Sequence, residues 1–405
     1  MQELSQNARR YRQSIVLGAL IGIAVAIVFT AGFLFRDLVD LRSAHAFGEG
    51  KVSAEYSLLV EVQALLDQHY LRQQPDSKER EYAAIRGMLA TMNDRYTFFV
   101  DPPVAQSESD VLAGTYGGIG VQVKRSENGD LTLYPFADSP ARVLGIQDGD
   151  ILLAINNIPV DINQQPDSID QMLRGEVKEG NGVEITIRKQ VNRDTETVII
   201  PFAVINVPSV VWRTLESNSQ IGYIQILIFT SRTPNELQAA LQDLQEKKVS
   251  ALVLDLRNNS GGLLRESVAA ASQFLDGGVI VYEKNNCEEH NLTAETGGLA
   301  TNLPLVVLVN QGTASAAELV AGAIRDRERG ILVGQSTFGK GTVQQIYRLS
   351  DNSSVHITSA EWLTPNRQRL DGKGLEPTIT MIPDPSGRDV ELGEALRYLE
   401  QEYLS

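Results

Sequence analysis

Cysteine and clustered histidine are almost absent from this sequence of 405 residues. Cys287 is the single cysteine, so the chain can form no internal disulfide and has no Cys-x-x-Cys redox or zinc pattern. The four histidines are scattered, and none belongs to a His-Glu-x-x-His pattern. We therefore expect neither a catalytic metal nor a cofactor.

Basic residues are fewer than acidic ones: the chain has 36 Lys and Arg and 51 Asp and Glu, which gives a formal net charge of −15. Nucleic-acid binding requires clustered Lys and Arg that neutralise phosphates, and no basic stripe is present. Nucleic acid is therefore not an expected partner. The composition is otherwise that of a globular protein, 42% hydrophobic and 21% charged, in a chain long enough for two or three domains.

Charge is missing altogether from residues 14–35, about 22 positions that suffice for a helix to cross ~30 Å of hydrocarbon. Three arginines precede this run, which predicts that residues 1–13 are cytoplasmic and that the rest of the chain lies outside, held at the cell membrane by a single transmembrane helix. A cleaved signal peptide is the alternative, because Ala44-His45-Ala46 resembles a cleavage site. That site lies about ten residues beyond an apolar run longer than usual for a signal peptide, which favours an uncleaved anchor.

The rest of the chain divides into segments with different patterns. Apolar residues at three- and four-residue spacing predict a helical segment over 52–112. Short strands and turn signals, among them Asn128-Gly129, predict a small β-rich module over 113–205. Strands and helices alternate over 206–376, which predicts an α/β layer, and residues 377–405 end in an amphipathic helix. The predicted fold class is α+β multidomain.

Ser315 stands where a buried strand passes through the turn Asn-Gln-Gly-Thr-Ala and enters a helix. That position exposes the hydroxyl at a strand end and directs the free N–H groups of the first helical turn toward an incoming group. Ser315 is therefore a candidate nucleophile. Helix capping by Thr313 or Ser315 is the commoner role of such residues and remains an alternative.

Lys340 lies between two glycines, 25 residues after Ser315, in the segment Phe-Gly-Lys-Gly-Thr-Val-Gln-Gln. In an extended strand Gln344 would share its face. No Asp or Glu occurs between Gly334 and Tyr347, so Lys340 could lie desolvated, with a lowered pKa, and act as a general base. A solvated loop lysine is the alternative.

The same segment nearly matches the P-loop of NTPases, but Gly341 occupies the position of the required Ser or Thr. The residues after it have the pattern of a strand, whereas a phosphate site needs the N-terminus of a helix. An NTPase is therefore disfavoured.

A glycine pair, Gly261-Gly262, follows another buried strand, at the edge where α/β folds place their sites. Such residues let a ligand approach the backbone, and their N–H groups could bind an oxyanion. Asp255 and Arg257, just upstream, are expected to form a structural ion pair. A plain turn is the alternative for the glycines.

Taken in order, these segments resemble the carboxyl-terminal processing peptidases, or tail-specific proteases, over roughly residues 55–380. The resemblance implies an α/β protease core of the ClpP/crotonase type. The catalytic residues that it implies are the nucleophile Ser315, the general base Lys340 and Gln344, which orients that lysine. The backbone of Ala316 and of one glycine of the pair Gly261-Gly262 would hold the oxyanion, and the choice between the two glycines stays open.

The β-rich module resembles a PDZ domain of the circularly permuted kind found in this family. Its residues Gly117, Gly118, Ile119 and Gly120 match the loop that binds a terminal carboxylate through backbone amides. The expected partners are therefore proteins or peptides with free C-termini. An activating partner and the oligomeric state are not specified by the sequence.

No Gly-x-Ser-x-Gly motif and no histidine in a catalytic context competes with this dyad. The sequence therefore predicts a membrane-bound serine endopeptidase that cleaves proteins near their C-termini. A non-catalytic membrane scaffold whose PDZ domain binds protein tails is the alternative, and the presence of both Ser315 and Lys340 argues against it.

Overall fold

The fold is known from a computed structural model that describes residues 56–126, 128–160, 169 and 171–404. It divides the chain into two compact units, Met1–Glu81 and Tyr82–Ser405. No helix among the described residues is long and apolar enough to cross a membrane. The predicted membrane span, residues 14–35, lies outside the described residues.

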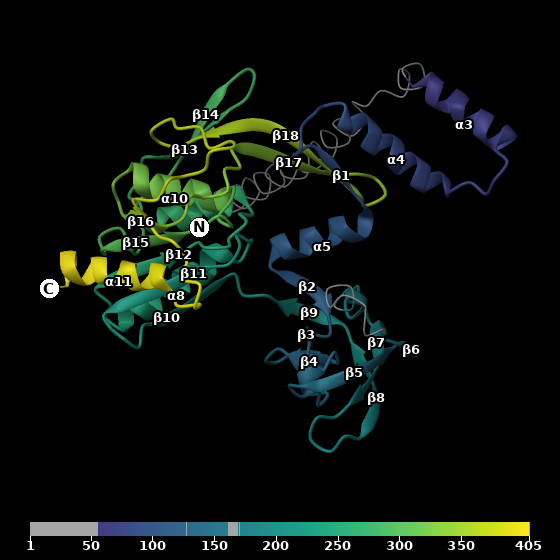
Figure 1. The fold of residues 1–405 in the computed structure, drawn as a ribbon, viewed down its shortest axis with the longest axis horizontal. Helices are drawn as coiled ribbons and strands as arrows, with labels where there is room; N and C mark the ends of the chain where they lie inside the picture. Colours follow the sequence, from purple (N-terminus) through teal and green to yellow (C-terminus); the bar gives the residue numbers. More distant parts are fainter. Residues whose placement is uncertain (1–55, 127, 161–168, 170, 405) are drawn as a thin grey trace, which may run out of the picture. The chain divides into compact units, whose positions relative to one another are not determined.

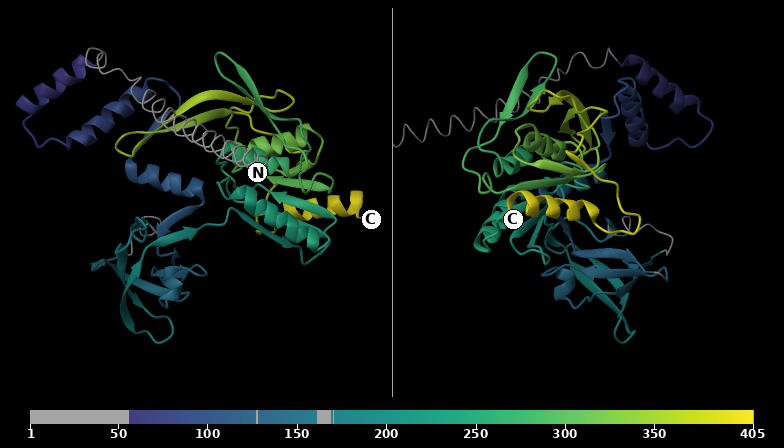
Figure 2. Two further views of the ribbon diagram at one scale, coloured as in Figure 1. Left: turned by 180° about the vertical axis from the view of Figure 1, so that it is seen from behind. Right: turned by 60° about the vertical axis from the view of Figure 1, so that its left-hand side comes forward.

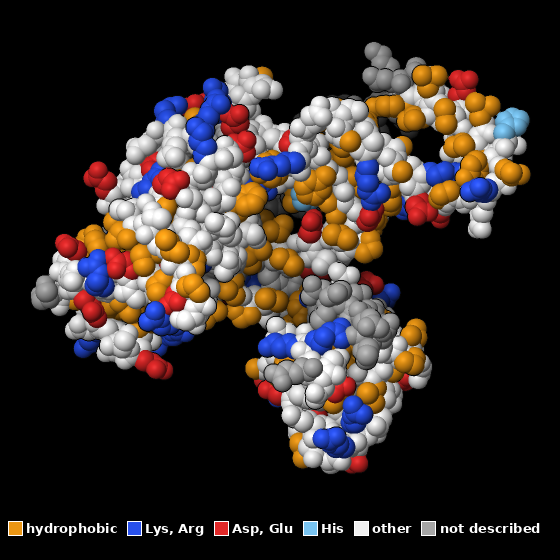
Figure 3. All heavy atoms as spheres, in the orientation of Figure 1, with side chains coloured by type: hydrophobic (Ala, Val, Ile, Leu, Met, Phe, Trp, Pro, Cys, Tyr) orange, Lys and Arg blue, Asp and Glu red, His pale blue; other side chains and the backbone are white. Residues whose placement is uncertain are grey.

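Helix α3, Ser57–His69, belongs to the first unit and buries none of its residues. Its large apolar side chains are exposed, for example Leu58 at 73% and Val60 at 68%, and hydrophobic side chains gather on its surface (Figure 3). Helix α4, Ser77–Ala90, spans the boundary between the units and also lacks buried residues. Both helices fall within the segment for which the sequence predicts helical structure.

The central sheet of the second unit has six strands in the order β10-β11-β12-β15-β16-β19 (Figure 1). Only β10 runs antiparallel to its neighbour. Every residue of the two central strands, β12 and β15, is buried, as their uninterrupted apolar sequences predict. The bounds are β10 Val210–Thr214, β11 Ile221–Ile226, β12 Ala251–Asp255, β15 Leu305–Val309, β16 Ile331–Gly334 and β19 Ile379–Thr380.

Helices cover both faces of this sheet (Figure 2). Leu252 and Leu254 of β12 belong to the core shared with three helices, whereas Val253 packs with Ala395 and Leu399 of α11 on the opposite face. This alternation follows from the two-residue period of a strand. The three helices are α8 Thr233–Glu246, α9 Leu264–Ser272 and α10 Ala316–Asp326, and α11 is Val390–Tyr403.

A second sheet, antiparallel, shares the core of the first through Val343, Ala360 and Trp362. Its order is β1-β18-β13-β14, and β17 pairs with β18 alone among the described strands, so one edge of β17 is unpaired. The bounds are β1 Phe98–Val100, β13 Val279–Lys284, β14 Glu289–Thr293, β17 Thr342–Arg348 and β18 Ser354–Leu363.

The β-rich module has a core of its own, centred on Ile119, Leu133 and Ile185. Its main sheet has the order β3-β4-β5-β7-β8 with β6 attached to β5, and β2 pairs separately with β9. The bounds are β2 Thr115–Gly118, β3 Val121–Arg125, β4 Leu131–Pro135, α6 Pro140–Val143, β5 Asp150–Ile155, β6 Ile158–Pro159, β7 Gly182–Arg188, β8 Thr195–Pro201 and β9 Ala203–Asn206.

Helix α5, Pro102–Ala113, connects β1 to this module. Its two prolines occupy the first helical positions, where a missing N–H costs nothing. The helix ends at Gly114, whose φ of 69° is the left-handed conformation that glycine adopts readily.

Candidate active site

Ser315 lies in the turn between β15 and α10, with φ 55° and ψ −122°. A positive φ in a residue with a side chain stores about 1–3 kcal/mol, and such residues cluster at functional sites. The Ser315 N–H donates to Oε2 of Glu318 at 2.9 Å, and the N–H of Ala314 donates to the carbonyl of Asn259 at 2.9 Å. The turn is thus held from both sides while Ser315 lines an open cleft.

Gly261 abuts this turn so closely that a Cβ on it would lie 2.8 Å from Cβ of Ser315. Its N–H donates to Oδ1 of Asn259 at 2.9 Å. Asn259 is fully buried, and its Nδ2 donates to the carbonyl of Ile226 at 2.8 Å. The Gly261 amide is therefore already engaged by a rigid acceptor.

The amides of Gly262 and Ala316 have a different environment. Within the described residues, neither N–H has an acceptor. Ala316 is the first residue of α10, where an N–H has no intrahelical partner and the helix dipole is positive. Gly262 lines the same cleft as Ser315. These two donors are therefore free to bind a negatively charged oxygen next to the hydroxyl.

Lys340 lines this cleft as well, and its Nζ donates to Oε1 of Gln344. Gln344 is held in turn, because its Nε2 donates to the carbonyl of Tyr96 at 2.5 Å. The Tyr96 ring lies beneath the ammonium, with Nζ 5.3 Å from its centroid. Lys340 and Gln344, which the sequence places on one face, are therefore in direct contact. Tyr96 contacts both, through its carbonyl to Gln344 and its ring to Lys340.

Burial lowers the pKa of Lys340 below its ordinary value of 10.5. Removing an ammonium from water disfavours its charged form, and no acidic side chain compensates. The Tyr96 ring attracts a cation and acts in the opposite direction, but a cation–π contact is the weaker effect. Lys340 is therefore biased toward the neutral amine that a general base requires.

Glu318 is the acidic residue nearest to both candidates, and it is fully buried. Its Oε2 accepts the N–H of Ser315 and, at 2.9 Å, that of Lys340. Its Oε1 accepts the N–H of Gly339 at 2.7 Å and the hydroxyl of Thr337 at 2.5 Å. One carboxylate thus joins the backbone of the serine turn to the backbone of the lysine segment. Four hydrogen bonds satisfy its charge without contacting Nζ.

The cleft has a volume of about 920 Å³. It brings together Ser315, Lys340, Gln344 and Gly262, which come from the turns at the ends of β15 and β12 and from the start of β17. Apolar side chains, among them Leu263 and Trp362, form much of the remaining wall. A space of this size and character suits a polypeptide segment.

The glycine-rich loop of the β-rich module is arranged differently. Gly117 and Gly118 belong to β2 and pair with β9. The Ile119 N–H donates to the carbonyl of Leu173 at 3.3 Å. Gly120 has φ +73° and forms the bend that leads into β3, an edge strand of its sheet. The loop therefore lies next to a free strand edge, and its Ile119 amide is already paired.

Three supporting residues were missed by sequence reasoning: Glu318, Asn259 and Tyr96. Glu318 had a signal, since Ser315-x-x-Glu318 is the spacing of a capping box. Asn259 and Tyr96 act through contacts with segments distant in sequence, which no local pattern reveals. Among the described residues, no group of His, Cys, Asp and Glu is arranged to hold a metal ion.

Comparison with known proteins identifies two parts of the chain. Residues 220–381 match peptidase family S41, and residues 136–185 match a PDZ domain. The chain is 33% identical over 332 residues to a carboxy-terminal-processing protease of Bartonella bacilliformis, covering 79% of this chain and 75% of that one. It is also 33% identical over 326 residues to a carboxyl-terminal-processing protease of a Picosynechococcus species, covering 80% and 78% of the two chains.

Solved structures agree in fold. A putative S41 protease from Bacteroides fragilis matches with a TM-score of 0.51 and 18% identity, over 84% of this chain and 96% of that one. This likeness supports an S41 protease fold with mixed α and β content. The chain therefore belongs to the carboxyl-terminal processing proteases of peptidase family S41, and it is a serine-type peptidase with a PDZ domain.

Proposed function

We propose that this peptidase works through a Ser315–Lys340 dyad. The observation that carries the proposal is that a strained serine and a half-buried lysine without a compensating carboxylate line the same cleft. In this arrangement the lysine amine bonds Gln344, so the transfer requires Nζ to turn toward Oγ of Ser315 as substrate binds. Hydrogen bonds of catalytic groups commonly tighten only when substrate is present.

The reaction begins when neutral Lys340 accepts the proton of the Ser315 hydroxyl, and Oγ attacks the scissile carbonyl carbon. The resulting ammonium donates that proton to the departing amine, which leaves an acyl-enzyme. Water, deprotonated by the same lysine, then hydrolyses the ester and regenerates Ser315. Gln344 orients the lysine by accepting its hydrogen bond, while Tyr96 fixes the Gln344 amide.

The oxyanion of each tetrahedral intermediate would be held by the N–H groups of Gly262 and Ala316. Engagement of the Gly261 amide by Asn259 favours Gly262 over its neighbour as the donor. Gly261 has another role, because its lack of a side chain lets this loop approach Ser315. A preformed donor of this kind typically contributes about 10²–10³ in rate.

The PDZ domain would present the substrate C-terminus to the cleft. Its Gly117, Gly118, Ile119 and Gly120 loop, next to the free edge of β3, suits an added peptide strand that ends in a carboxylate. The substrates are therefore proteins or peptides with free C-termini, cut near that end. Because Ile119 already bonds Leu173, binding requires that this contact be exchanged for one to the peptide.

The test is cleavage of a peptide library varied at its last three residues, with products mapped by mass spectrometry. We expect the full chain to cut a subset of peptides near the C-terminus and the Ser315→Ala variant to cut none. Retained cleavage by purified Ser315→Ala protein would overturn the assignment of the nucleophile. Equal cleavage of all tails would remove the PDZ domain from substrate selection.

Residues 14–35 would hold the enzyme in the cell membrane, with its catalytic domain outside the cytoplasm. The support is their lack of charge and the arginines before them. External protease added to intact spheroplasts should digest the catalytic domain. Digestion only after membrane lysis would contradict this orientation.

A further inference from the structure

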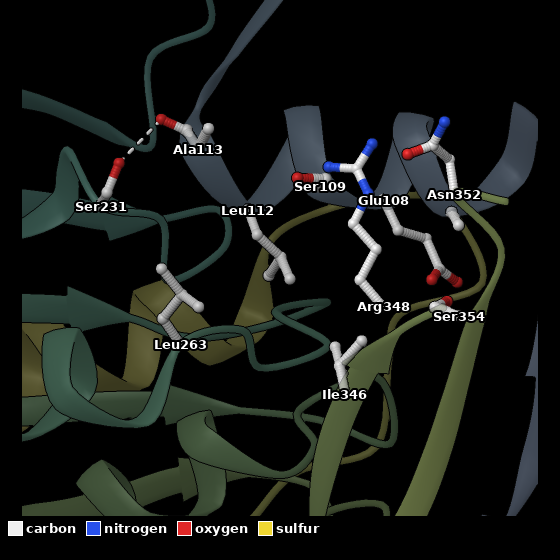
Figure 4. Close-up of a pocket in the computed structure, with 11 residues that line it drawn as sticks. Glu108, Ser109, Leu112, Ala113, Ser231, Leu263, Ile346, Arg348, Asn352 and Ser354 are labelled. Atoms are coloured by element: carbon white, nitrogen blue, oxygen red, sulfur yellow. Dashed lines mark hydrogen bonds between the residues drawn. The ribbon is translucent and has the colours of Figure 1, made fainter. Parts of the chain in front are cut away.

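A second cavity of about 430 Å³ lies between helix α5 and strand β17 (Figure 4). Its floor is aliphatic and is formed by Leu112, Leu263 and Ile346. Polar groups gather at its other end, where Arg348 and Ser354 stand opposite each other in the β17–β18 pair. The cavity thus combines an apolar surface with a cluster of hydrogen-bond donors.

This cavity continues the catalytic cleft. Glu108, Leu112, Leu263 and Ile346 line both spaces. Strand β17 runs beside them, from Thr342 in the cleft to Arg348 in the cavity, and its unpaired edge offers backbone N–H and C=O groups along the whole path. An extended polypeptide can therefore pass from one space to the other while pairing with that edge.

The two donors at the far end are incompletely paired among the described residues. Arg348 forms no ion pair within the described residues, and its guanidinium contacts only the neutral Oε1 of Gln106, at 3.1 Å. The nearby Glu108 instead pairs with His356, whose Nε2 lies 3.1 Å from its Oε2. Ser354 is 4% exposed, and its buried hydroxyl has no hydrogen-bond partner. A buried hydroxyl without a partner and a guanidinium without an ion pair among the described residues line the same cavity, and a carboxylate could bind both.

We propose that this cavity, the α5–β17 subsite, binds a segment of the substrate that carries an aliphatic residue followed by a carboxylate. The inference rests on the proposed peptidase function and defines its substrate class more closely. The aliphatic side chain contacts Leu112, Leu263 and Ile346, and the carboxylate binds Arg348 and Ser354. A polypeptide is the occupant because the space is continuous with the cleft, and its carboxylate complements Arg348, which has no ion pair among the described residues.

The course of β17 sets the distance between the proposed carboxylate contact at Arg348 and the scissile bond. Arg348 is eight positions beyond Lys340, and an extended chain advances about 3.3 Å per residue, so the two lie roughly 26 Å apart along the path. The carboxylate should therefore be about seven to nine residues from the scissile bond. Shorter peptides can reach the dyad but not Arg348.

The experiment measures kcat/KM of the full chain for peptides with a glutamate moved one position at a time, from four to ten residues on either side of the scissile bond. Each peptide has partners with glutamine or lysine at that position, and every peptide is tested with its terminal carboxylate free and amidated. We expect the wild type to prefer glutamate over lysine by about fivefold near position eight, and Arg348→Glu to reverse the order. If amidation alone removes the effect, the terminal carboxylate is the group that binds.

Lys248→Glu is the matched control, since Lys248 is an exposed residue in the turn after α8 that forms no ion pair with any described residue. It changes net charge by the same amount and should leave the preference unaltered. The inference is overturned if no position on either side depends on charge, or if Lys248→Glu changes the preference as much as Arg348→Glu. Cleavage of short peptides that still requires Ser315 would then leave the proposed peptidase function intact.

Discussion

Two glycine-containing loops of this chain were expected to bind an anion through backbone amides, and they differ in what those amides already bind. In the catalytic cleft, the N–H groups of Gly262 and Ala316 lack acceptors among the described residues. In the PDZ loop, Gly118 lies between β9 and Arg174, and the Ile119 N–H donates to the carbonyl of Leu173. The first loop is ready to receive an oxygen, whereas the second must first exchange a bond.

The difference shows that glycine content alone does not define an anion site. Each loop has residues with positive φ, which lets the backbone bend, but the availability of an N–H depends on contacts made elsewhere in the fold. In the cleft, Asn259 engages Gly261 and leaves the next amide free. A preorganised donor stabilises charge without reorganisation, so the cleft should respond more strongly to substitution than the PDZ loop.

The largest loss of activity should come from substituting the two members of the proposed dyad, which tests whether the cleft is catalytic. Ser315→Ala and Lys340→Ala should each abolish peptide cleavage, because the hydroxyl and the amine act in the same step. The double variant should be no worse than either single one, since removing one partner already removes the function of the other. Rates from purified proteins, with circular dichroism to establish folding, decide this. Full activity in folded Lys340→Ala would exclude the dyad.

The next largest loss of activity should come from Asn259, whose side chain bonds Gly261 and so positions the free N–H of Gly262. Asn259→Ala should lower kcat about a hundredfold with a smaller change in KM, because Gly261 loses its acceptor and the loop no longer holds Gly262 in place. The variant should also be less stable, by about 1–3 kcal/mol for each buried group left unpaired.

Asn258→Gly serves as its control. Asn258 is the neighbouring residue and bonds Asn310 through its side chain, at 2.9 Å, without contacting the glycine pair. A kcat loss in Asn258→Gly equal to that in Asn259→Ala would mean that general loosening of the loop, rather than the Gly261 bond, causes the effect.

The pH dependence of kcat/KM tests the other member of the dyad. Because burial lowers the pKa of Lys340, the amine is protonated below that pKa and neutral above it. Activity should therefore rise about tenfold per pH unit on the acid side and level off below the ordinary lysine value of 10.5. A rate that keeps rising steeply beyond pH ~10, in protein that remains folded, would mean that Lys340 is not desolvated as the structure indicates.

Much of this site could be predicted from sequence, because its main parts are local patterns. A strand, a turn and a helix start located Ser315, and a segment free of carboxylates indicated that Lys340 is desolvated. Alternating strands and helices likewise predicted the central sheet. The family resemblance supplied the roles that these patterns left open.

The parts that could not be predicted are those that depend on tertiary contacts. The positive φ of Ser315, the four bonds of buried Glu318 and the contact of Tyr96 with Gln344 join segments that are distant in sequence or shaped by their neighbours. The same holds for the bond between Ile119 and Leu173 in the PDZ loop. A pattern of residues indicates which groups are present but not which of them another segment already binds.

The smallest effect should come from the PDZ loop. If it captures the substrate carboxylate, C-terminal amidation of a good peptide should slow cleavage by about tenfold at most, since a charge-assisted hydrogen bond contributes about 1.5–3 kcal/mol against ~1 for a neutral one. The cost of breaking the Ile119–Leu173 bond reduces this effect of amidation further.

Gly118→Val should also slow cleavage, because its Cβ would lie 2.9 Å from the Tyr116 ring and 3.1 Å from the Leu173 carbonyl and would disturb the loop. Gly393→Val, in α11 with open space around it and without a positive φ, is the control. The measurement is kcat/KM for free-acid and amidated peptides with each variant. If the wild type cuts the two forms equally, the loop is no carboxylate receptor, and the Ile119–Leu173 bond is its final state rather than a resting one.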